Sequence, residues 1–495
     1  MSLLNQNNQI KKLEEDFQKK VKLQNEEASI KTLKDVLICN DRKRWNRFKR
    51  LLSDEDKLLS EEEKLINIIV DMTHNKDLEV QLSKFFFNLK KNHPDNYNLF
   101  FNATFNIMKK VAHELPTCND IELLKFNDEH VDKRKESKTK KVKITRRKIF
   151  CLLIHAFFCT FDGSEKELIS GGKLFSFEKI YSFIGWKGYM IEKLNCFINY
   201  FNLMAIELIS KNDKFLEEKV SFKRSKLNTN FRKSSLIDGL SKKEPLGKIK
   251  FMNGKIEDYR ERHSTHLDFA NRYIGGGALG RGCVQEEILF LIKPECIVSG
   301  LIAPVMKSDE CIILGHCIQY STYSGYSSSF KFKDSFENFK NTLTPPILAI
   351  DALKFNDKNS YEEYKYQSLK HEFLKLYIGF ISIKTKNVCT GNWGCGAFLG
   401  TLELKMLIQW IAFTQAKLNL RNRHNDIRIN ENNNENTLIY FGLDNNERLK
   451  KFANELNEKT FTINQLFKLI YHFGKNKNYK IKSGNNLIEF LLNNL

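Results

Sequence analysis

The chain has 495 residues, of which 41% are hydrophobic and 12% aromatic, so it is too long for one ordinary core and too apolar for a disordered protein. Its formal net charge of +20 attracts polyanions such as nucleic acid, anionic lipid or a phosphorylated polymer, although a solvated basic surface gives the same charge. The longest apolar run, residues 149–161, is shorter than the ~20 residues of a membrane-spanning helix, and the amino terminus lacks a signal-peptide pattern. We therefore predict a soluble globular protein with two domains.

Helical patterns dominate the first half of the chain. Up to about residue 90, apolar residues recur every three or four positions, as in "SEEEKLINIIVDMTHNKDLEVQLSKFFFNLKK", which is typical of amphipathic helices; residues 1–30 are expected to be a loose arm. Residues 127–148 are strongly basic and predict an exposed loop, which binds a polyanion, serves as a nuclear address or is simply solvated. Helical patterns resume at "RRKIFCLLIHAFFCTF" and "MIEKLNCFINYFNLMAIEL". We predict a helical accessory domain over residues 1–244.

The second half of the chain predicts a layered α/β domain over residues 245–495. Buried strands are indicated by the runs "KIKFM", "IVSGLIAPV", "CIILGHCIQ", "ILAIDAL" and "TLIYFG". Helical patterns lie between them at Gln285 to Lys293, Tyr361 to Tyr377 and Leu402 to Ala416, and near Asn445 and Thr462. Residues 421–436 are polar and predict a surface insertion. The 11 cysteines show no CxxC pair and no zinc spacing, which favours reduced thiols and no metal site.

The segment "LDFANRYIGGGALGRGCVQEEILFLI" combines bare backbone with carboxylates. Gly275, Gly276 and Gly277 permit positive φ and close approach of a ligand, and the helix that follows adds a positive dipole end that suits phosphate. Glu286 and Glu287 fall in the first turn of that helix, about 100° apart, so they share one patch. A tight turn explains the glycines alone and a stabilised helix start explains the glutamates alone, but neither explains both.

Two other segments have the composition of a binding site. "CTGNWGCGAFLG", residues 389–400, places Gly391, Gly394 and Gly396 in one short loop after a strand, where backbone amides can surround an anion. "QYSTYSGYSSSF", residues 319–330, carries three tyrosines, Tyr320, Tyr323 and Tyr326, which predict core, rim or stacking positions.

Taken in order, these segments resemble the poly(ADP-ribose) glycohydrolase family. In that family a glycine triplet is followed about seven residues later by Gln-Glu-Glu, as in "GGGALGRGCVQEE". "TGNWGCGAF" resembles the family's diphosphate loop, "YSGYSSSF" its adenine-side tyrosine segment, and "RRKIFCLLIHAFFCTF" part of its helical domain. The resemblance covers roughly residues 145–475. It implies an α/β fold with a macrodomain-like mixed sheet between helix layers, preceded by a helical accessory domain.

The resemblance also implies an activity and the residues that perform it. The reaction is hydrolysis of ribose–ribose O-glycosidic bonds in poly(ADP-ribose), which releases ADP-ribose through an oxocarbenium-like transition state. Glu287 is the expected general acid, Glu286 holds ribose hydroxyls, and Asp268 positions the site. The expected substrate contacts are Ile256, Glu257, Asn271, Gly275, Gly276, Gly277, Gln285, Tyr326, Asn392, Gly394, Cys395, Gly396, Ala397, Phe398 and Phe441.

The partners implied by the resemblance are poly(ADP-ribose) and ADP-ribosylated proteins, with no cofactor, metal, membrane or nucleic acid required. We expect a monomer in the nucleus, the cytoplasm or both. Two alternatives stay open. A non-catalytic macrodomain reader binds ADP-ribose without an acid pair, so the two glutamates argue against it. A basic nucleic-acid-binding protein would explain the charge, but the sequence shows no nucleic-acid fold signature.

Overall fold

The computed structural model describes residues 32–53, 58–126, 137–161, 175–228, 239–358, 360–423, 436–442, 446–458, 461–475 and 485–494. The predicted arm at residues 1–30 lies outside them, as does residues 424–435 of the predicted insertion. Among the described residues, no helix combines the length and apolar character needed to cross a membrane.

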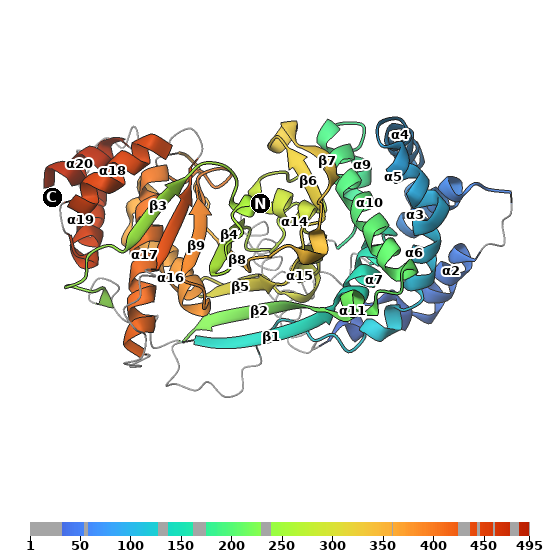
Figure 1. Cartoon of the computed structure of the whole chain (residues 1–495), viewed down its shortest axis with the longest axis horizontal. Coiled ribbons are helices and arrows are strands. Elements are labelled where there is room, and N and C mark those ends of the chain that lie inside the picture. Colours follow the sequence, from blue (N-terminus) through green and yellow to red (C-terminus); the bar gives the residue numbers. More distant parts are fainter. Residues whose placement is uncertain are drawn as a thin grey trace, which may run out of the picture.

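A mixed eight-stranded sheet forms the centre of the molecule (Figure 1). Its strand order is β1-β2-β5-β8-β4-β9-β10-β3. The strands β8, β4, β9, β10 and β3 run parallel to one another. The neighbouring pairs β1–β2, β2–β5 and β5–β8 are antiparallel. The strands are β1 (Ser137–Thr145), β2 (Lys219–Leu227), β3 (Lys248–Met252), β4 (Ser264–Ala270), β5 (Glu310–Gly315), β8 (Ile347–Asp351), β9 (Asn387–Gly391) and β10 (Thr437–Phe441), with a separate hairpin of β6 (Ser321–Ser324) and β7 (Lys331–Ser335).

Helices cover both faces of the sheet. Successive strand residues point to opposite sides, so each central strand gives apolar side chains to both faces, and both must be covered. In β8, Leu348 and Ile350 pack with the carboxyl-terminal helices, whereas Ile347 and Ala349 belong to the core shared with the amino-terminal helices. The first layer contains α16 (Tyr366–Ser382), α17 (Leu402–Arg423), α18 (Asn446–Glu458), α19 (Ile463–Lys475) and α20 (Asn485–Asn494). The second layer contains α14 (Gln285–Ile292) and α15 (Ser299–Ile302), with α7 (Arg146–Phe157) and α10 (Gly188–Ile209) of the helical part behind them.

The helical part packs at one side of the sheet, shown in blue and green in Figure 1. A capping box begins α3: the Ser60 hydroxyl accepts the N–H of Glu63, and the Ser60 N–H donates to the Glu63 carboxylate. Its helices are α2 (Arg42–Leu52), α3 (Glu61–Thr73), α4 (Asp77–Asn92), α5 (Pro94–Leu99), α6 (Phe105–Ala112), α7 (Arg146–Phe157), α9 (Glu178–Ser182), α10 (Gly188–Ile209) and α11 (Asp213–Glu217), with a π-helical turn at Phe100–Thr104.

The exposed loop predicted for the basic stretch 127–148 is wrong over most of its length. Residues 137–145 form the edge strand β1 and residues 146–148 begin α7, while residues 127–136 lie outside the described part. Val142 and Ile144 point inward, whereas Lys141 and Lys143 face outward, where they protect an open sheet edge from pairing with other chains. Figure 1 shows β1 and β2 running together from the sheet to the helical part, so the first half of the chain supplies two strands of the sheet.

Most elements predicted for the second half are present, including the helix beginning at Gln285 and the four strands read from "KIKFM", "CIILGHCIQ", "ILAIDAL" and "TLIYFG". The strand predicted from "IVSGLIAPV" is wrong, because this short apolar run forms a 3-10 turn and α15, which are buried on every side. A short apolar run fits either state when burial is complete. The domain boundary predicted near residue 244 falls between β2 and β3.

Candidate active site

Four segments of the predicted site follow the carboxyl ends of parallel strands. Asn271 follows β4, Asn392 follows β9, Phe441 ends β10, and Ile256 comes four residues after β3. Parallel strands end at the same edge of a sheet, and ligands of α/β proteins bind outside that edge. The fold therefore brings the predicted segments to one region.

The loop of residues 271–284 joins β4 to α14 and is called the glycine loop here. Gln285, the first residue of α14, fastens the helix start to the strand: its side-chain oxygen accepts the Phe269 N–H at 2.8 Å, and its side-chain nitrogen donates to the Leu267 carbonyl at 3.2 Å. Gln285 is thus engaged with the backbone of β4.

Glu286 and Glu287 both turn back onto the glycine loop. The Glu286 carboxylate accepts the N–H groups of Asn271 at 2.9 Å and Gly275 at 2.7 Å. The Glu287 carboxylate accepts the N–H groups of Gly277 at 2.7 Å and Val284 at 3.0 Å. Their residues are 3% and 6% exposed, so each carboxylate is nearly buried and held in place by two backbone donors.

Gly276 lies between these two carboxylates, which explains the glycine triplet. It has a φ of +48°, and a Cβ at this position would collide with the Glu287 and Glu286 carboxylate oxygens. Gly282 is similarly constrained, because its Cβ would lie 2.6 Å from the carboxylate carbon of Glu287. The glycines are needed so that the backbone can wrap closely around the two side chains.

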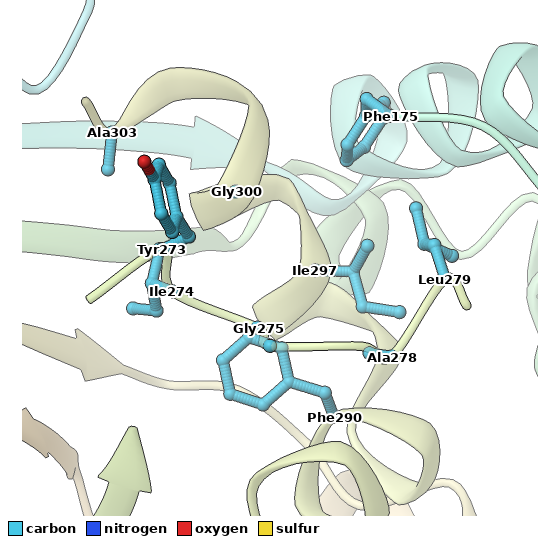
Figure 2. Close-up of a pocket in the computed structure, with 11 residues that line it drawn as sticks. Phe175, Tyr273, Ile274, Gly275, Ala278, Leu279, Phe290, Ile297, Gly300 and Ala303 are labelled. Carbon is cyan, nitrogen blue, oxygen red and sulfur yellow. The ribbon is translucent and has the colours of Figure 1, made fainter. Parts of the chain in front are cut away.

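The opposite side of the glycine loop faces an apolar cavity of about 50 Å³ (Figure 2). Phe290, Ile297 and Phe175 contribute to its wall, and a Cβ on Gly275 would lie 3.2 Å from the Phe290 ring. Neither glutamate lines this cavity. Gly275 and Gly276 both border this cavity, and Gly276 also lies against the two carboxylates.

Asp268 is fully buried in β4, on the face opposite to Leu267. Neither of its carboxylate oxygens has a hydrogen-bond partner among the residues that the structure describes. Burial, with the negative charge of Glu287 as a second cause, raises the pKa of Asp268 well above its ordinary value. Burial therefore favours the protonated, neutral form of the Asp268 side chain.

The loop of residues 392–400 joins β9 to α17 and is called the amide loop here. Trp393 anchors it by donating its indole N–H to the Ile350 carbonyl at 2.8 Å, and the Tyr440 hydroxyl donates to the Asn392 side-chain oxygen at 2.9 Å. Gly394 has a φ of +74°, and its carbonyl accepts the Gly400 N–H at 2.9 Å, which closes the loop.

Three consecutive N–H groups of the amide loop are open. Within the described part of the chain, those of Gly396, Ala397 and Phe398 donate to no other group. Gly396 and Ala397 are exposed, and a Cβ on Gly396 would meet nothing within 4 Å. Successive unpaired N–H groups of this kind form a concave donor surface that suits an anion.

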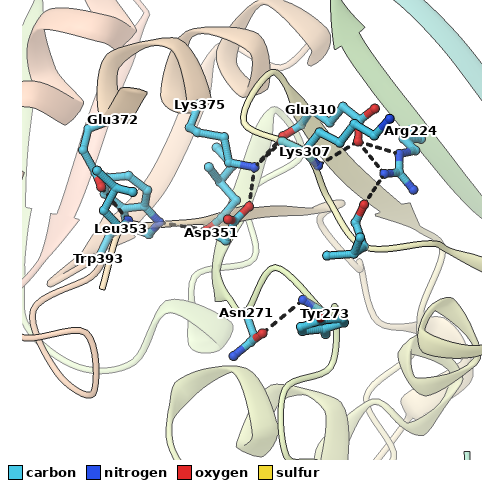
Figure 3. Close-up of polar contacts among 12 residues, drawn as sticks. Arg224, Asn271, Tyr273, Lys307, Glu310, Asp351, Leu353, Glu372, Lys375 and Trp393 are labelled. Atoms are coloured by element: carbon cyan, nitrogen blue, oxygen red, sulfur yellow. Dashed lines mark hydrogen bonds and ion pairs between the residues drawn. The ribbon is translucent and has the colours of Figure 1, made fainter. Parts of the chain in front are cut away.

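A buried ion pair between Lys405 and Glu372 packs against the amide loop. The Lys405 ammonium, in the first turn of α17, lies 2.8 Å from the Glu372 carboxylate, and both side chains are almost fully buried. Glu372 also accepts the Leu353 N–H at 2.6 Å. Figure 3 shows Glu372 and Leu353 beside Trp393, and the Asp351–Lys375 ion pair at the end of β8. These lysines and glutamates were not among the predicted site residues, although a charged residue at a buried helix position is a readable signal.

The three predicted tyrosines have three different environments. Tyr320 is a core residue that donates to Glu295 at 2.8 Å, and Tyr323 donates its hydroxyl to the Glu257 carboxylate. Tyr326 is 52% exposed, and burial of its hydroxyl raises its pKa while the Gln285 N–H acts in the opposite direction. The exposed part of Tyr326 is therefore available to a ligand beside the start of α14.

Ile256 and Phe441 meet in one small cluster of buried residues with Cys389 and Ile439. The Tyr259 ring lies 6.1 Å from the Phe441 ring. The Tyr323–Glu257 contact joins this cluster to the tyrosine segment. The segments at 256–257, 323–326 and 441, which are far apart in the sequence, are therefore close in the fold.

Comparisons with known proteins agree with this arrangement. Residues 93–224 match the family model of the poly(ADP-ribose) glycohydrolase helical domain, and residues 238–424 match that of its macro domain fold. The chain is 33% identical over 257 residues to poly(ADP-ribose) glycohydrolase 1 of Caenorhabditis elegans, covering 48% of this chain and 31% of that protein. It is 30% identical over 237 residues to poly(ADP-ribose) glycohydrolase 1 of Arabidopsis thaliana, covering 33% and 43% respectively.

A third relative, the probable poly(ADP-ribose) glycohydrolase 2 of Arabidopsis thaliana, is 28% identical over 332 residues, covering 56% of this chain and 61% of the relative. The chain thus matches less than two thirds of the length of each of these relatives. The two family models together match most of the chain, and they are the two catalytic parts of one family. With its mixed macrodomain sheet and its preceding helices, this chain belongs to the poly(ADP-ribose) glycohydrolase family.

Proposed function

We propose that the chain hydrolyses ribose–ribose O-glycosidic bonds in poly(ADP-ribose) and releases ADP-ribose. The observation that carries this proposal is the pair of nearly buried carboxylates, Glu286 and Glu287, fixed on the glycine loop by four backbone N–H groups. Glycoside hydrolysis requires an acid in a defined position beside the sugar. The named activity of the relatives agrees with it.

The amide loop is the proposed diphosphate site. Its open N–H groups at Gly396, Ala397 and Phe398 offer donors to phosphate oxygens, with Asn392, Gly394 and Cys395 forming the rest of the turn. Backbone N–H groups recognise phosphate without a counter-ion, so this mode of binding needs no arginine in the loop. The net charge of +20 would also draw a polyanionic polymer toward the protein.

The adenosine end is assigned to the cluster that joins Ile256, Glu257 and Phe441, with Tyr326 as a stacking surface. Tyr326 has the exposed area that a planar ring requires, and Glu257 offers a carboxylate acceptor for an amino group. The distal ribose is assigned to Gly275, Gly276, Gly277 and Asn271 of the glycine loop. Gln285 contributes by holding α14 on β4, since its side chain already bonds the strand.

Glu287 is the proposed general acid, which gives its proton to the leaving ribose oxygen. Glu286 holds ribose hydroxyls, and Asp268, whose burial raises its pKa and favours the neutral form, positions the site without adding a further charge beside the two glutamates. Since both glutamates lie on one face, we expect Glu287 to activate water on the side vacated by the leaving group, with retention of configuration. Methanol trapping tests this step: a methyl glycoside of inverted configuration contradicts it.

The direct test is incubation of the purified full-length chain with labelled poly(ADP-ribose), followed by identification of the products. ADP-ribose release is expected from the wild type, and Glu287→Gln and Glu287→Ala should each lower kcat by about 10² to 10⁴. ADP-ribose binding, measured by calorimetry, should persist in both variants because its diphosphate donors belong to the amide loop. Glu362→Gln, an exposed acid far from these loops in the sequence, is the matched control.

The same assay separates the alternatives. A non-catalytic reader binds ADP-ribose and leaves the polymer intact. A nucleic-acid-binding protein would lose poly(ADP-ribose) to competing DNA at physiological salt, whereas the proposed enzyme should retain it. A wild-type chain that binds ADP-ribose without product release contradicts the catalytic proposal.

A further inference from the structure

Lys193 of α10 reaches from the helical part into the glycine loop. Its ammonium donates to the carbonyls of Gly277 at 3.1 Å, Gly280 at 2.6 Å and Gly282 at 2.6 Å. An ammonium has three N–H donors, and all three are used here. The Lys193 side chain is fully buried, and α10 packs against α14 at this point.

The three carbonyls that Lys193 bonds belong to one curled turn. The Gly277 carbonyl also accepts the N–H groups of Gly280 at 2.8 Å and Gly282 at 3.2 Å. Carbonyl dipoles that converge on one buried point repel one another unless a cation or several donors lie between them. The loop's own hydrogen bonds satisfy these carbonyls only in part. The ammonium therefore stabilises this conformation of the loop.

This turn is connected directly to Glu287. The peptide group on the amino side of Gly277 donates its N–H to the Glu287 carboxylate at 2.7 Å, and the one on the carboxyl side is bonded by Lys193. Gly282, another Lys193 partner, packs against the Glu287 carboxylate. A shift of either glycine would change the position of the carboxylate that it contacts.

A second contact from the same face of α10 supports this attachment. Tyr189 is one helical turn before Lys193, and its hydroxyl donates to the Arg281 carbonyl at 2.9 Å. Arg281 in turn lies over the Phe183 ring at 4.9 Å. The tip of the glycine loop is thus held by residues of the helical part at several points.

We propose that Lys193 is a positioning residue for the reaction: its ammonium fixes the carbonyls of Gly277, Gly280 and Gly282, and through Gly277 it holds Glu287 in place. This inference rests on the proposed function, since it names Glu287 as the acid. It makes the helical part a component of the active site, because a side chain from that part determines the shape of the glycine loop.

The charge on Lys193 is sensitive to pH within an accessible range. Burial lowers its pKa to about 8, although neighbouring groups act in the opposite direction. Burial raises the pKa of Cys283 to about 11, and it also raises that of Cys196 and Tyr189. The ionisable groups near the ammonium are Glu287 on α14, Cys283 and Arg281 on the loop, Cys196 and Tyr189 on α10, and Lys179 on α9.

The first test compares Lys193→Met with Lys193→Arg in the full-length chain. The Met variant fills the same buried space without donors, so kcat on poly(ADP-ribose) should fall about 10- to 100-fold, the usual cost of losing a supporting contact. Arg keeps the charge and should recover part of the loss. In the wild type, kcat should decline as pH rises through about 8. That decline should move to higher pH in Lys193→Arg, since guanidinium stays charged.

Tyr189→Phe is the matched control, because it removes one bond from the same helix face and leaves the charge intact. It should lower kcat less than Lys193→Met and leave the alkaline decline unchanged. A folded Lys193→Met variant with wild-type kcat would overturn the proposal. An alkaline decline at the same pH in wild type and Lys193→Arg would overturn it too, because it would then belong to another group.

A second measurement separates this inference from the proposed function. Hydrogen exchange of the peptide covering residues 272–287 is followed in wild type between pH 7 and 9, after correction for the intrinsic pH dependence of exchange, and in Lys193→Met at pH 7. Loss of protection above pH 8 and in the variant is expected whether or not the chain is active. Unchanged protection in both would reject the role of Lys193, and an inactive wild type with the expected exchange would reject only the enzymatic function.

Discussion

The two glycine-containing loops of the site use their backbone groups in opposite ways. The glycine loop directs four N–H groups onto the protein's own carboxylates, Glu286 and Glu287, and gives three carbonyls to Lys193. The amide loop leaves three N–H groups open to solvent. We therefore propose that the glycine loop, whose donors are already bonded, positions the carboxylates, and that the amide loop, whose donors are open, binds the ligand. The same residue type thus serves two tasks, which only the neighbouring side chains distinguish.

Each loop is also supported by a buried lysine, but the two lysines act differently. Lys193 bonds its loop directly. Lys405 pairs with Glu372 and packs beneath Gly394 and Gly400, where Cβ atoms would approach its side chain closely. We therefore expect loss of Lys193 to affect mainly catalysis and loss of Lys405 to affect mainly stability.

The largest stability effect is expected for Lys405→Met. It leaves the Glu372 carboxylate buried without its cation, and breaking a buried pair in this way costs about 3–5 kcal/mol in the free energy of unfolding. The measurement is urea unfolding at pH 7. Lys365→Met, which breaks an exposed ion pair with Glu362, is the control and should cost at most about 1 kcal/mol. If Lys405→Met and Lys365→Met are equally stable, Lys405 does not support the amide loop.

Gly276→Ala and Gly396→Ala compare the two loops at matched positions. The Gly276 Cβ would displace both glutamate carboxylates, so we expect kcat to fall at least about 100-fold, the effect of a ~1 Å misplacement. The Gly396 Cβ meets nothing, so this variant should be within about 0.5 kcal/mol of wild type in unfolding free energy. A rise in KM for Gly396→Ala would indicate that substrate approaches there. Equal kcat values for the two variants would contradict the division of roles between the loops.

Sequence patterns predicted a layered α/β domain, its strands β3, β5, β8 and β10, and the glycine loop with its two glutamates, whereas the mixed sheet was implied by the family resemblance. The signals were local: a strand, a glycine triplet and a helix start follow one another in 26 residues. Lys193 could not be found in this way, because it acts on a loop that is 84 to 89 residues away in the sequence. Lys405 follows its loop directly, and its signal was a charged residue at a buried helix position. Only the fold brings an α10 side chain to residues 277–282.

The strand β1 shows a different limit. Its residues "SKTKKVKIT" have too many lysines to resemble a buried strand, and the alternation of Val142 and Ile144 is too short to outweigh them. Pairing with β2 along its whole length decides the structure. Tertiary pairing overrides composition at an edge strand. Charged residues are favoured there because they prevent the edge from pairing with other chains.

Variants of Tyr326 test whether its exposed ring binds the adenine of the ligand. Its exposed ring makes few contacts that the fold needs, so Tyr326→Ala should leave the unfolding free energy within about 0.5 kcal/mol of wild type. Loss of a stacked base costs about 1–3 kcal/mol, so the ADP-ribose Kd should rise roughly 5- to 150-fold. Tyr326→Phe retains the ring and should bind nearly as wild type. Equal Kd values for the Ala and Phe variants would place adenine elsewhere.

The pH dependence of stability tests whether Asp268 keeps its proton in the folded protein. Its pKa is raised in the folded state, so the folded chain keeps a proton that the unfolded chain releases above the ordinary value of 3.8. The stabilisation from this group is complete below that value and is lost as pH rises toward the folded pKa, by about 1.4 kcal/mol per pH unit. Asp268→Asn has no such proton, so its unfolding free energy relative to wild type should increase with pH across this window.

The informative quantity is the slope of the unfolding free-energy difference against pH. The absolute difference is not informative, because burying the amide of Asp268→Asn adds a cost that does not change with pH. Guanidinium unfolding of both chains at several pH values above 4 gives the difference directly. Parallel curves would mean that Asp268 is ionised in the folded protein. The neutral positioning role proposed for Asp268 would then be wrong, because its charge would be buried beside the two glutamates that the glycine loop already holds.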